Sequence, residues 1–294
     1  MQALIAPRRQ VVVFARGARC DNRSVCGRYV LASPGAAIAE HFRLADLPAY
    51  PPRYNIAPTQ DALVVRETPG GSREAVSLRW GLIPFWAKEP SIGSRLINAR
   101  AEGVVDKPAF RAAFRRRRCL VPADGFFEWR ALASGRKQPY YIRLASGEPF
   151  AMAGLWEQWR PPAGAPERSG GTSRGRGDAI AKTHELFTES GAPPPAPGSH
   201  LPPPAAGTAP PSASDTIATF TIVTTAANAE LRALHDRMPV IVAPTDYDEW
   251  LSSPNPSALL GPWAGAAFAI APIGTRVNDV RNDDPELLQP VPGV

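Results

Sequence analysis

Five side chains of this sequence combine proton-transfer and anion-binding chemistry at short spacings. Asn98 and Arg100 stand two residues apart, and His235 stands two residues before Arg237. Glu128 lies among three aromatic side chains, and a carboxyl group that is desolvated in this way has a raised pKa suited to proton transfer near neutral pH. An imidazole titrates in the same range. These residues indicate an acid–base site beside cations that attract an anion.

Each of these residues also has a structural interpretation. The segment around Asn98 can be a solvated turn between a strand and a helix, and Glu128 can lie on the wet face of a half-buried strand. A single histidine such as His235 is more often a surface or hydrogen-bonded residue than a catalyst. Trp80, Trp86 and Trp129 can stack on bases, but tryptophans are more often part of a core.

The length, net charge and cysteine count restrict the class of protein. The 294 residues carry a net charge of +6, which favours anionic partners such as nucleic acid or a membrane surface, although many basic proteins bind no specific anion. The cysteines Cys20, Cys26 and Cys119 are odd in number and widely spaced, which argues against a disulfide framework. The four histidines are scattered, so we expect no metal site. No run of about 18 apolar residues is present, and no membrane span is expected.

The hydrophobic pattern predicts short strands joined by turns, with a few short helices. Helical spacing is expected at 36–44 and 107–117, a helix leading into a strand at 229–242, and a helical turn at 246–251. Strands, some with turns between them, are expected at 26–32, 53–67, 76–86, 119–130, 140–145, 150–159, 219–228 and from 268 onward. We expect one domain from residue 26 to 294.

Two segments fall outside this pattern. Residues 161–216 are rich in Pro, Gly, Ser and Ala and are predicted to be a flexible insertion, with one helical turn near 179–188. Residues 1–25 carry five arginines and one acidic residue, which is compatible with a transit peptide but not with a secretory signal. We expect them to be a non-native leader or the product of a misassigned start.

The misassigned start has a simple origin. Bacterial genes often begin on a GTG codon, which encodes valine internally and methionine at initiation. If Val25 is that start, the protein begins Met-Cys26, and methionine is readily removed before a small residue. Cys26 would then be the amino-terminal residue. A cleaved propeptide of 25 residues is the alternative.

Seven blocks of sequence, none strong alone, occur together in the order of one family. They are CGRY (26–29), RYNIAPTQ (53–60), RWGLIP (79–84), NARAE (98–102), RCLVPADGFFEW (118–129), AGLWE (153–157) and HDRMP (235–239). In these blocks the chain resembles the SRAP family (SOS response-associated peptidase), the abasic-site processing proteins. The resemblance runs from Cys26 to about Asn282 and implies an α+β fold, a β-rich single domain of mostly antiparallel sheet with a few short helices.

The resemblance also implies an activity. Family members bind single-stranded DNA and trap the ring-opened aldehyde of an abasic site as a thiazolidine on an amino-terminal cysteine, which here is Cys26. Asn98, Glu128 and His235 match the other catalytic positions. The DNA-binding positions carried over are Arg28, Pro58, Trp86, Arg100 and Arg237, with Trp86 and Pro58 where the DNA is bent. No cofactor and no metal are implied, and we expect a monomer in the bacterial cytoplasm, associated with the nucleoid during repair.

Only an amino-terminal cysteine suits this chemistry. Its amine adds to the aldehyde to form an imine, and its thiol closes a five-membered ring that resists hydrolysis. An α-amine has a pKa of about 7.7–8.0, so much more of it is free base at neutral pH than of a lysine amine. We expect the thiol, with a reference pKa of about 8.5, to be partly ionised as well. Glu128 is expected to transfer protons, His235 to accept a proton or bind the sugar or phosphate, and Asn98 to orient the reactants.

Two other functions fit the same residues. Cys26 can be the nucleophile of an amino-terminal-nucleophile peptidase or amidase without a DNA substrate. The chain can also be a non-enzymatic single-strand-binding module with a structural Cys26. The family name implies a peptidase activity that removes the residues before Cys26. Gly103 departs from the family pattern, in which threonine is expected after Glu102, and this affects the hydrogen bonding expected around Asn98.

Overall fold

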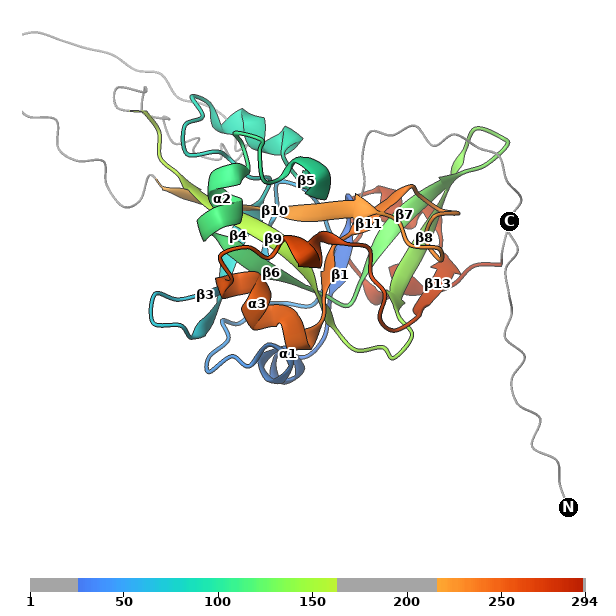
Figure 1. Ribbon diagram of the computed structural model, residues 1–294. Helices are drawn as coiled ribbons and strands as arrows, with labels where there is room; N and C mark the ends of the chain where they lie inside the picture. The colour runs from blue at the N-terminus through green and yellow to red at the C-terminus, as the bar shows by residue number, and fades with distance from the viewer. Residues whose placement is uncertain (1–25, 163–215, 293–294) are drawn as a thin grey trace, which may run out of the picture. The chain divides into compact units, whose positions relative to one another are not determined.

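The computed structural model of the protein describes residues 26–162 and 216–292 (Figure 1). Apart from Pro161 and Pro162, these residues belong to one compact unit. The predicted leader and the predicted insertion, except its first two residues and its last, lie outside the described residues, as does the helical turn predicted near 179–188.

One sheet holds five strands in the order β13-β8-β7-β1-β2, and all of its pairings are antiparallel. Short runs of β-branched and aromatic residues form these strands, as expected for a pleated, half-buried surface. Their bounds are β1 Tyr29–Leu31, β2 Arg53–Ile56, β7 Gly125–Ala131, β8 Lys137–Leu144 and β13 Phe268–Pro272.

The other sheet closes on itself. β10 pairs with both β4 and β9, and β4 pairs onward through β3 and β6 to β9, so five strands form a ring around the main hydrophobic core. β5, β11 and β12 extend this sheet, and the β10–β4 and β10–β5 pairings are parallel. The strands are β3 Asp61–Glu67, β4 Arg73–Trp80, β5 Asn98–Arg100, β6 Arg118–Ala123, β9 Phe150–Trp159, β10 Ile217–Ala226, β11 Arg237–Pro239 and β12 Ile241–Val242.

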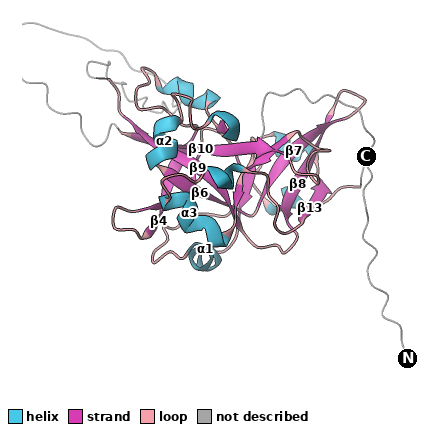
Figure 2. Ribbon diagram, viewed as in Figure 1, coloured by secondary structure: helices cyan, strands magenta, loops and turns pink. Residues whose placement is uncertain are grey.

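The helices are short and lie outside the strands (Figure 2). They are α1 Gly35–Phe42, α2 Arg111–Arg116 and α3 Tyr247–Ser252, together with several 3-10 turns. Each places its apolar side chains toward the sheets: Ile38 and Phe42 of α1, Phe114 of α2 and Trp250 of α3 are buried. Within the described residues, none of the helices has the length and apolar character needed to cross a membrane.

The predicted α+β, mostly antiparallel architecture is confirmed, and several local predictions need correction. Residues 229–234, predicted to be helical, form turns, and 81–86 form a loop rather than the end of a strand. The helix predicted at 107–117 begins only at Arg111, because 107–110 form turns. Trp80 is fully buried against Phe220 and belongs to the core, not to a base-stacking surface.

Candidate active site

The backbone nitrogen of Cys26 is hydrogen-bonded to the carboxyl group of Glu128. Cys26 N donates a hydrogen bond of 2.8 Å to Glu128 Oε1, and both residues are buried. The structural alternative for Glu128, a place on the wet face of its strand, is therefore wrong, because only 3% of the residue is exposed. A buried carboxyl group paired with the nitrogen of a cysteine is an arrangement for moving protons on and off that nitrogen.

Strand pairing creates this contact. β1 and β7 pair antiparallel with Tyr29 opposite Phe126, and the ladder continues with Phe127 N donating to Arg28 O at 3.1 Å. One residue further along β7, Glu128 comes opposite the residues that precede β1, where Cys26 stands. A shift of one residue in this register would turn the Glu128 side chain to the other face of the sheet.

Burial changes the proton affinity of Glu128. Loss of solvation raises the pKa of Glu128 to about 8, and the hydrogen bonds from the backbone N–H groups of Cys26 and Trp129 oppose this rise. The carboxyl group is therefore largely protonated at neutral pH. The prediction that Glu128 is desolvated, with a pKa suited to proton transfer near neutrality, agrees with this environment.

The thiol of Cys26 is buried. Burial, with the Glu128 charge as a second cause, raises the pKa of this thiol well above its ordinary value in the 294-residue chain. The partly ionised thiol was expected of an amino-terminal Cys26 and stays a prediction. Cys26 Sγ lies 4.0 Å from the thioether sulfur of Met152 on β9, so Cys26 sits where the two sheets meet.

His235 is a buried, neutral imidazole. Its Nδ1 accepts a hydrogen bond of 3.0 Å from the backbone N–H of Arg237, and Asp236 Oδ1 lies at the same distance. Burial lowers the pKa of His235, while Asp236 partly offsets the effect. A neutral ring whose Nδ1 accepts carries its proton on Nε2. Asp236 and Lys137 shift the pKa of both His235 and Glu128, which puts the two groups in one electrostatic environment.

Asn98 and Arg100 are the ends of one short strand. β5 lies parallel to β10 with Asn98 opposite Ile222 and Arg100 opposite Thr224. Asn98 is half-buried and Arg100 is exposed. The interpretation of this segment as a solvated strand-to-helix turn holds only in part: β5 is paired with β10, and it runs into a 3-10 turn at Ala101–Gly103, where Arg100 and Glu102 are exposed.

Arg237 is held in place by its neighbours. Its Nη1 and Nη2 donate to the two carboxylate oxygens of Glu102 at 2.8 and 3.0 Å, and Nη2 also donates to the Thr224 carbonyl at 2.6 Å. The hydrogen bond and charge of Arg237 lower the pKa of Glu102. A bidentate pair of this kind fixes the guanidinium plane. The phosphate contact predicted for Arg237 stays a prediction.

Trp86 stands in an exposed aromatic pair. Phe85 and Trp86 are 59% and 49% exposed, at the tip of the loop that follows β4. The base of this loop is fixed because Gly81 and Gly93 cross closely: a Cβ on Gly81, whose φ is +126°, would lie 2.6 Å from the Gly93 carbonyl oxygen. Ile83 and Ala87 of the loop pack in a small cluster with Trp159. The aromatic pair is thus presented to solvent on a rigid support.

The turn that carries Pro58 lies beside the same loop. Pro58 is half-buried, and the next residue, Thr59, donates its backbone N–H to the carbonyl of Trp80 at 2.8 Å, where the Phe85–Trp86 loop begins. The two predicted DNA-bending residues thus come from neighbouring loops.

Loss of the Trp86 ring is expected to weaken binding of single-stranded DNA. Stacking on a base is worth about 1–3 kcal/mol, so we expect Trp86→Ala to reduce affinity about 5- to 150-fold. Fluorescence anisotropy with an oligonucleotide carrying a tetrahydrofuran abasic analogue measures this without covalent chemistry. Val280→Ala, which removes another exposed apolar side chain, is the control. Equal affinities of the two variants would contradict a stacking role.

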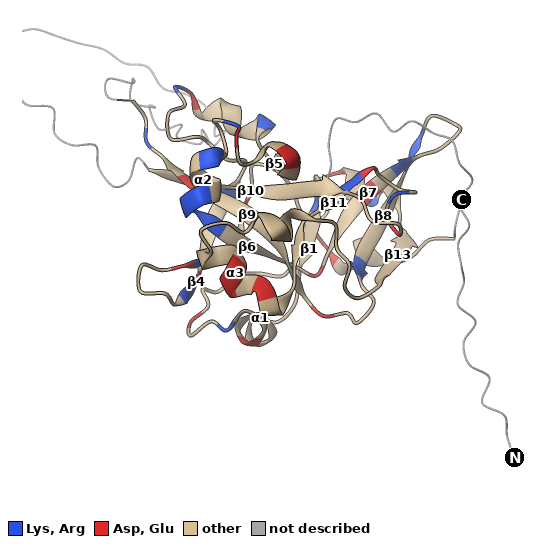
Figure 3. Ribbon diagram, in the orientation of Figure 1, with Lys and Arg blue, Asp and Glu red and all other residues tan. Residues whose placement is uncertain are grey.

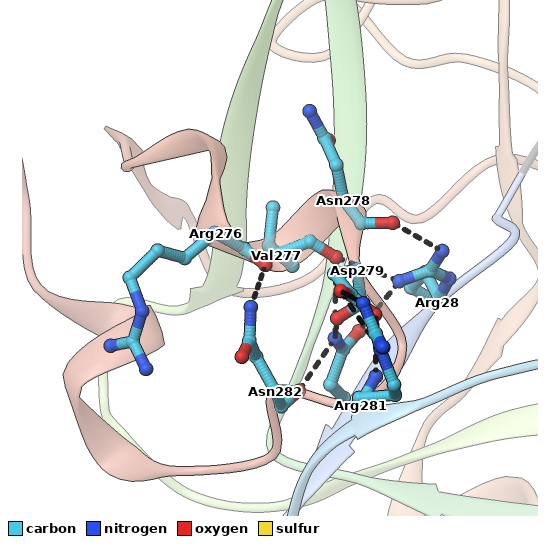
Figure 4. A network of polar contacts seen from close by, with 8 residues as sticks. Arg28, Arg276, Val277, Asn278, Asp279, Arg281 and Asn282 are labelled. Atoms are coloured by element: carbon cyan, nitrogen blue, oxygen red, sulfur yellow. Dashed lines mark hydrogen bonds and ion pairs between the residues drawn. The ribbon is translucent and has the colours of Figure 1, made fainter.

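Arg28 is bound to the C-terminal segment (Figure 4). Its Nη1 donates to the Val277 carbonyl at 2.7 Å and to Asn55 Oδ1 at 3.0 Å, and its Nη2 donates to the Asn278 carbonyl at 3.2 Å. Arg28 therefore links the residues after Cys26 to the loop at 277–282. Its predicted contact with DNA stays a prediction.

Removal of the Arg28 side chain is expected to destabilise the fold. Arg28→Ala leaves acceptors of a partly buried network without donors, and we expect the free energy of unfolding to fall by about 2 kcal/mol. Arg281→Ala is the matched control in the same network, since Arg281 is 86% exposed and pairs only with Asp279. Thermal unfolding measures both. Equal shifts in the two melting temperatures would contradict the anchoring role.

Sequence reasoning missed several residues of this region. Phe85 is more exposed than Trp86, and its position beside a tryptophan at a loop tip was an available signal. Met152, Lys137 and the pairing of Glu102 with Arg237 depend on contacts between segments far apart in the chain, for which the sequence carries no signal. Among the described residues, no group of three or more His, Cys, Asp or Glu side chains is arranged to hold a metal ion.

The fold and the Cys26–Glu128 pair define a class: a two-sheet α+β protein with a buried carboxyl group hydrogen-bonded to a cysteine nitrogen where the sheets meet. Within this class, the chain belongs to the SOS response associated peptidase (SRAP) family, whose model matches residues 25–175 and 204–280.

Two relatives and one solved structure illustrate the similarity. The chain is 33% identical over 273 residues to the abasic site processing protein YoqW of Bacillus subtilis (strain 168), covering 90% of this chain and 99% of that protein. It is 34% identical over 272 residues to the abasic site processing protein YoaM of the same strain, covering 90% and 97%. A crystal structure of a protein from Bacteroides thetaiotaomicron shares the fold, with a TM-score of 0.65, 22% identity and coverage of 90% and 100%.

Proposed function

We propose that this protein detects abasic sites in single-stranded DNA and links itself to them covalently through Cys26 as its amino-terminal residue. The observation that carries the proposal is the buried 2.8 Å contact between Cys26 N and Glu128 Oε1. The names of the relatives as abasic site processing proteins support the choice of substrate. The family match, which begins at residue 25, supports a start immediately before Cys26.

Glu128 keeps the amine reactive. In a buried pair of a carboxyl and an amine, the neutral form, with the proton on the carboxyl, is favoured over the ion pair because both charges lose solvation. The amine of Cys26 is then free base and attacks the aldehyde carbon of the opened sugar. The proton on Glu128 is transferred to the carbinolamine hydroxyl, which leaves as water and gives the imine.

The thiol reacts second. Its raised pKa keeps it neutral while the amine attacks, so we infer that the imine forms before the ring closes. The thiol then adds to the imine carbon, and its proton passes to the imine nitrogen. One aldehyde, one amine and one thiol thus give one thiazolidine and one water.

His235 and Asn98 are assigned to position the reactants during imine formation and ring closure. We assign His235 to donate from Nε2 to the hydroxyl of the opened sugar or to the adjacent phosphate, which its neutral state supports. We assign Asn98 to orient the sugar or the cysteine amine by hydrogen bonds from its amide.

The remaining assignments concern the DNA. Arg100 and Arg237 are assigned to phosphates, with Arg237 held by Glu102 in one orientation. Trp86, together with Phe85, stacks on bases beside the lesion, and Pro58 borders the bend. Phosphate contacts and stacking do not read sequence, so we expect little sequence preference and a strong dependence on salt. Arg28 is assigned to the strand end nearest Cys26, and the protein is proposed to act as a monomer.

A peptidase step belongs to the same site. We propose that the chain hydrolyses its own peptide bond before Cys26 when residues precede it. The nitrogen of Cys26 is the leaving group of that reaction, and the adjacent Glu128 carboxyl is assigned to protonate it. A lyase-type activity, release of the DNA strand after imine formation, is the corresponding proposal for the DNA substrate.

A denaturing gel tests the proposed function. A chain that begins Met-Cys26 is incubated with single-stranded DNA that holds one abasic site, and we expect a slower band that survives denaturation. Cys26→Ala retains an α-amine but no thiol, so it should give only an adduct that needs reduction to survive. A stable band with Cys26→Ala, or none with the wild type, would contradict the proposal.

A further inference from the structure

A row of basic side chains follows α2 and lies outside the catalytic assignments. Lys107, Arg111 and Arg115 are spaced four residues apart and all are exposed. Arg111 and Arg115 lie four residues apart on one face of α2. Arg111 N donates to the Lys107 carbonyl at 2.9 Å, so Lys107 lies one backbone turn before the helix begins. We name these three residues the α2 ridge. Figure 3 shows basic positions gathered on α2.

The arginine run 115–118 separates into structural and free cations. Arg118 is buried and donates to the carbonyls of Phe114, Leu251 and Ser253, and Arg117 pairs with Glu157 at 2.6 Å. Within residues 26–162 and 216–292, by contrast, the side chains of Lys107, Arg111 and Arg115 have neither a hydrogen bond nor an ion pair. The fold therefore leaves the ridge charges uncompensated in that part of the chain.

Hydrogen bonds connect the ridge to the candidate site. Arg237 is paired with Glu102, and the neighbouring Gly103 accepts a hydrogen bond of 3.0 Å from Lys107 N. On the other side, Trp86 Nε1 lies 3.4 Å from the carbonyl of Pro108, the residue after Lys107. The ridge thus begins between the assigned phosphate-binding residue and the exposed aromatic pair.

Gly103 allows this arrangement. A Cβ on residue 103 would lie 3.0 Å from Cε and 3.4 Å from Cδ of Lys107, so a side chain there would push the lysine aside. With glycine, the Lys107 side chain packs close to the backbone of residue 103. The departure from threonine at this position therefore leaves room for one ridge cation.

We propose that the α2 ridge binds the phosphates of the single strand that leaves the abasic site, after the strand has passed Trp86. The inference rests on the proposed function, since the lesion places the strand. Arg111 and Arg115 are separated by about 6 Å of rise along α2, and Lys107 precedes them by one backbone turn, so each cation is free to meet a separate phosphate. Flexible cations without acidic partners neutralise phosphates regardless of base sequence.

The salt dependence of binding measures the number of phosphates involved. Each phosphate contact on a single strand contributes about 0.7 to the slope of log affinity against log salt, so three contacts contribute about 2. We expect the triple variant Lys107→Gln, Arg111→Gln, Arg115→Gln to lose that part of the slope. From about 50 to 200 mM salt, the wild type should lose about 20-fold more affinity than the triple variant.

The experiment measures binding affinity by fluorescence anisotropy with single-stranded oligonucleotides that carry a central tetrahydrofuran analogue. One oligonucleotide has long flanks on both sides of the analogue, and in two others the 5′ or the 3′ flank is trimmed to two nucleotides. We expect one trimmed flank, and not the other, to remove the difference between the wild type and the triple variant. Arg111→Gln and Arg115→Gln are compared singly with Arg43→Gln, an exposed arginine at the end of α1. Arg43→Gln should keep the wild-type slope.

The outcomes separate the ridge from the proposed function. Two results would overturn the proposal that the α2 ridge binds phosphates. One is an equal salt-dependence slope for the wild type and the triple variant, and the other is a difference in slope that persists with both trimmed oligonucleotides. The tetrahydrofuran analogue has no aldehyde, so this result does not depend on covalent chemistry. If the wild type forms no adduct with aldehyde-bearing DNA, the proposed function is overturned. The salt-dependence slopes still test whether the α2 ridge binds phosphates.

Discussion

Glu128→Gln should slow formation of the DNA adduct at least about 100-fold at pH 7, the range expected for loss of a general acid–base group. The amide has the size of the carboxyl group and accepts the same hydrogen bond from Cys26 N, but it carries no transferable proton. It neither keeps the amine as free base nor protonates the departing hydroxyl. Single-turnover kinetics on denaturing gels, with DNA at saturating concentration, give the rate constant.

The pH profile separates proton transfer from positioning. Burial raises the pKa of Glu128, so the wild-type rate should fall at alkaline pH as the carboxyl group loses its proton, while the residual rate of Glu128→Gln should lack this limb. Matching profiles, or an unchanged rate in Glu128→Gln, would show that Glu128 is not the acid–base group.

Stability provides the control for Glu128→Gln. In the full-length chain, the folded state holds the Glu128 proton up to about pH 8, whereas an unfolded glutamate releases it near pH 4.3. Its stabilising contribution is complete below about pH 4.3 and is lost as pH rises through about 8. Glu128→Gln does not titrate, so relative to the wild type it should gain stability as pH rises, and thermal unfolding of both chains across this pH range measures the difference.

A single residue placed before Cys26 should abolish the stable adduct. A chain that begins Met-Ala-Cys26 loses its methionine and exposes the alanine amine, and Cys26 N becomes an amide. An amide does not form an imine, and the alanine amine lacks a thiol at the distance that closes a five-membered ring. We expect no adduct above the background of Cys26→Ala, measured on the same gels.

The chain that begins Met-Ala-Cys26 keeps every other residue of the site, so its comparison with the Met-Cys26 chain tests the amino-terminal amine alone. Its noncovalent affinity for DNA with a tetrahydrofuran analogue should match that of the Met-Cys26 chain within about twofold. Intact mass must show that the alanine is retained, because the proposed peptidase step would remove it. An adduct from a chain that still carries the alanine would contradict the role of the amino-terminal amine.

The sequence predicted the fold class well because its signals are local. Alternating apolar residues with Pro, Gly and Asp turns mark strands such as β6, β7 and β9 without knowledge of their partners. Of the helix and strand expected at 229–242, the strand is present and the helix was wrong, because apolar spacing alone does not separate a helix from successive turns whose side chains fill a core position. Leu231 and Leu234 are buried from such turns. Closure of the second sheet depends on pairings between β10 and strands more than 100 residues earlier, for which a single sequence has no signal.

The candidate site was predicted by residue type, and its environment was predicted only at Glu128, whose aromatic neighbours in the sequence indicated desolvation. Cys26 and His235 come from segments far from Glu128 in the chain, and their burial arises only from tertiary packing. The thiol of Cys26 shows this most clearly, because the spacing of its neighbours gives no sign of burial. Arg237 was identified as a cation near the site, whereas its bidentate partner Glu102 lies 135 residues away.

Intact mass spectrometry of the Met-Cys26 chain after incubation with an abasic oligonucleotide tests the central claim most directly. We predict a species that has lost the initiator methionine and gained the mass of the oligonucleotide less one water, with the modification on the peptide that begins at Cys26. A chain of unchanged mass, or an adduct located on any other residue, would contradict the assignment of Cys26 as the group that captures the aldehyde.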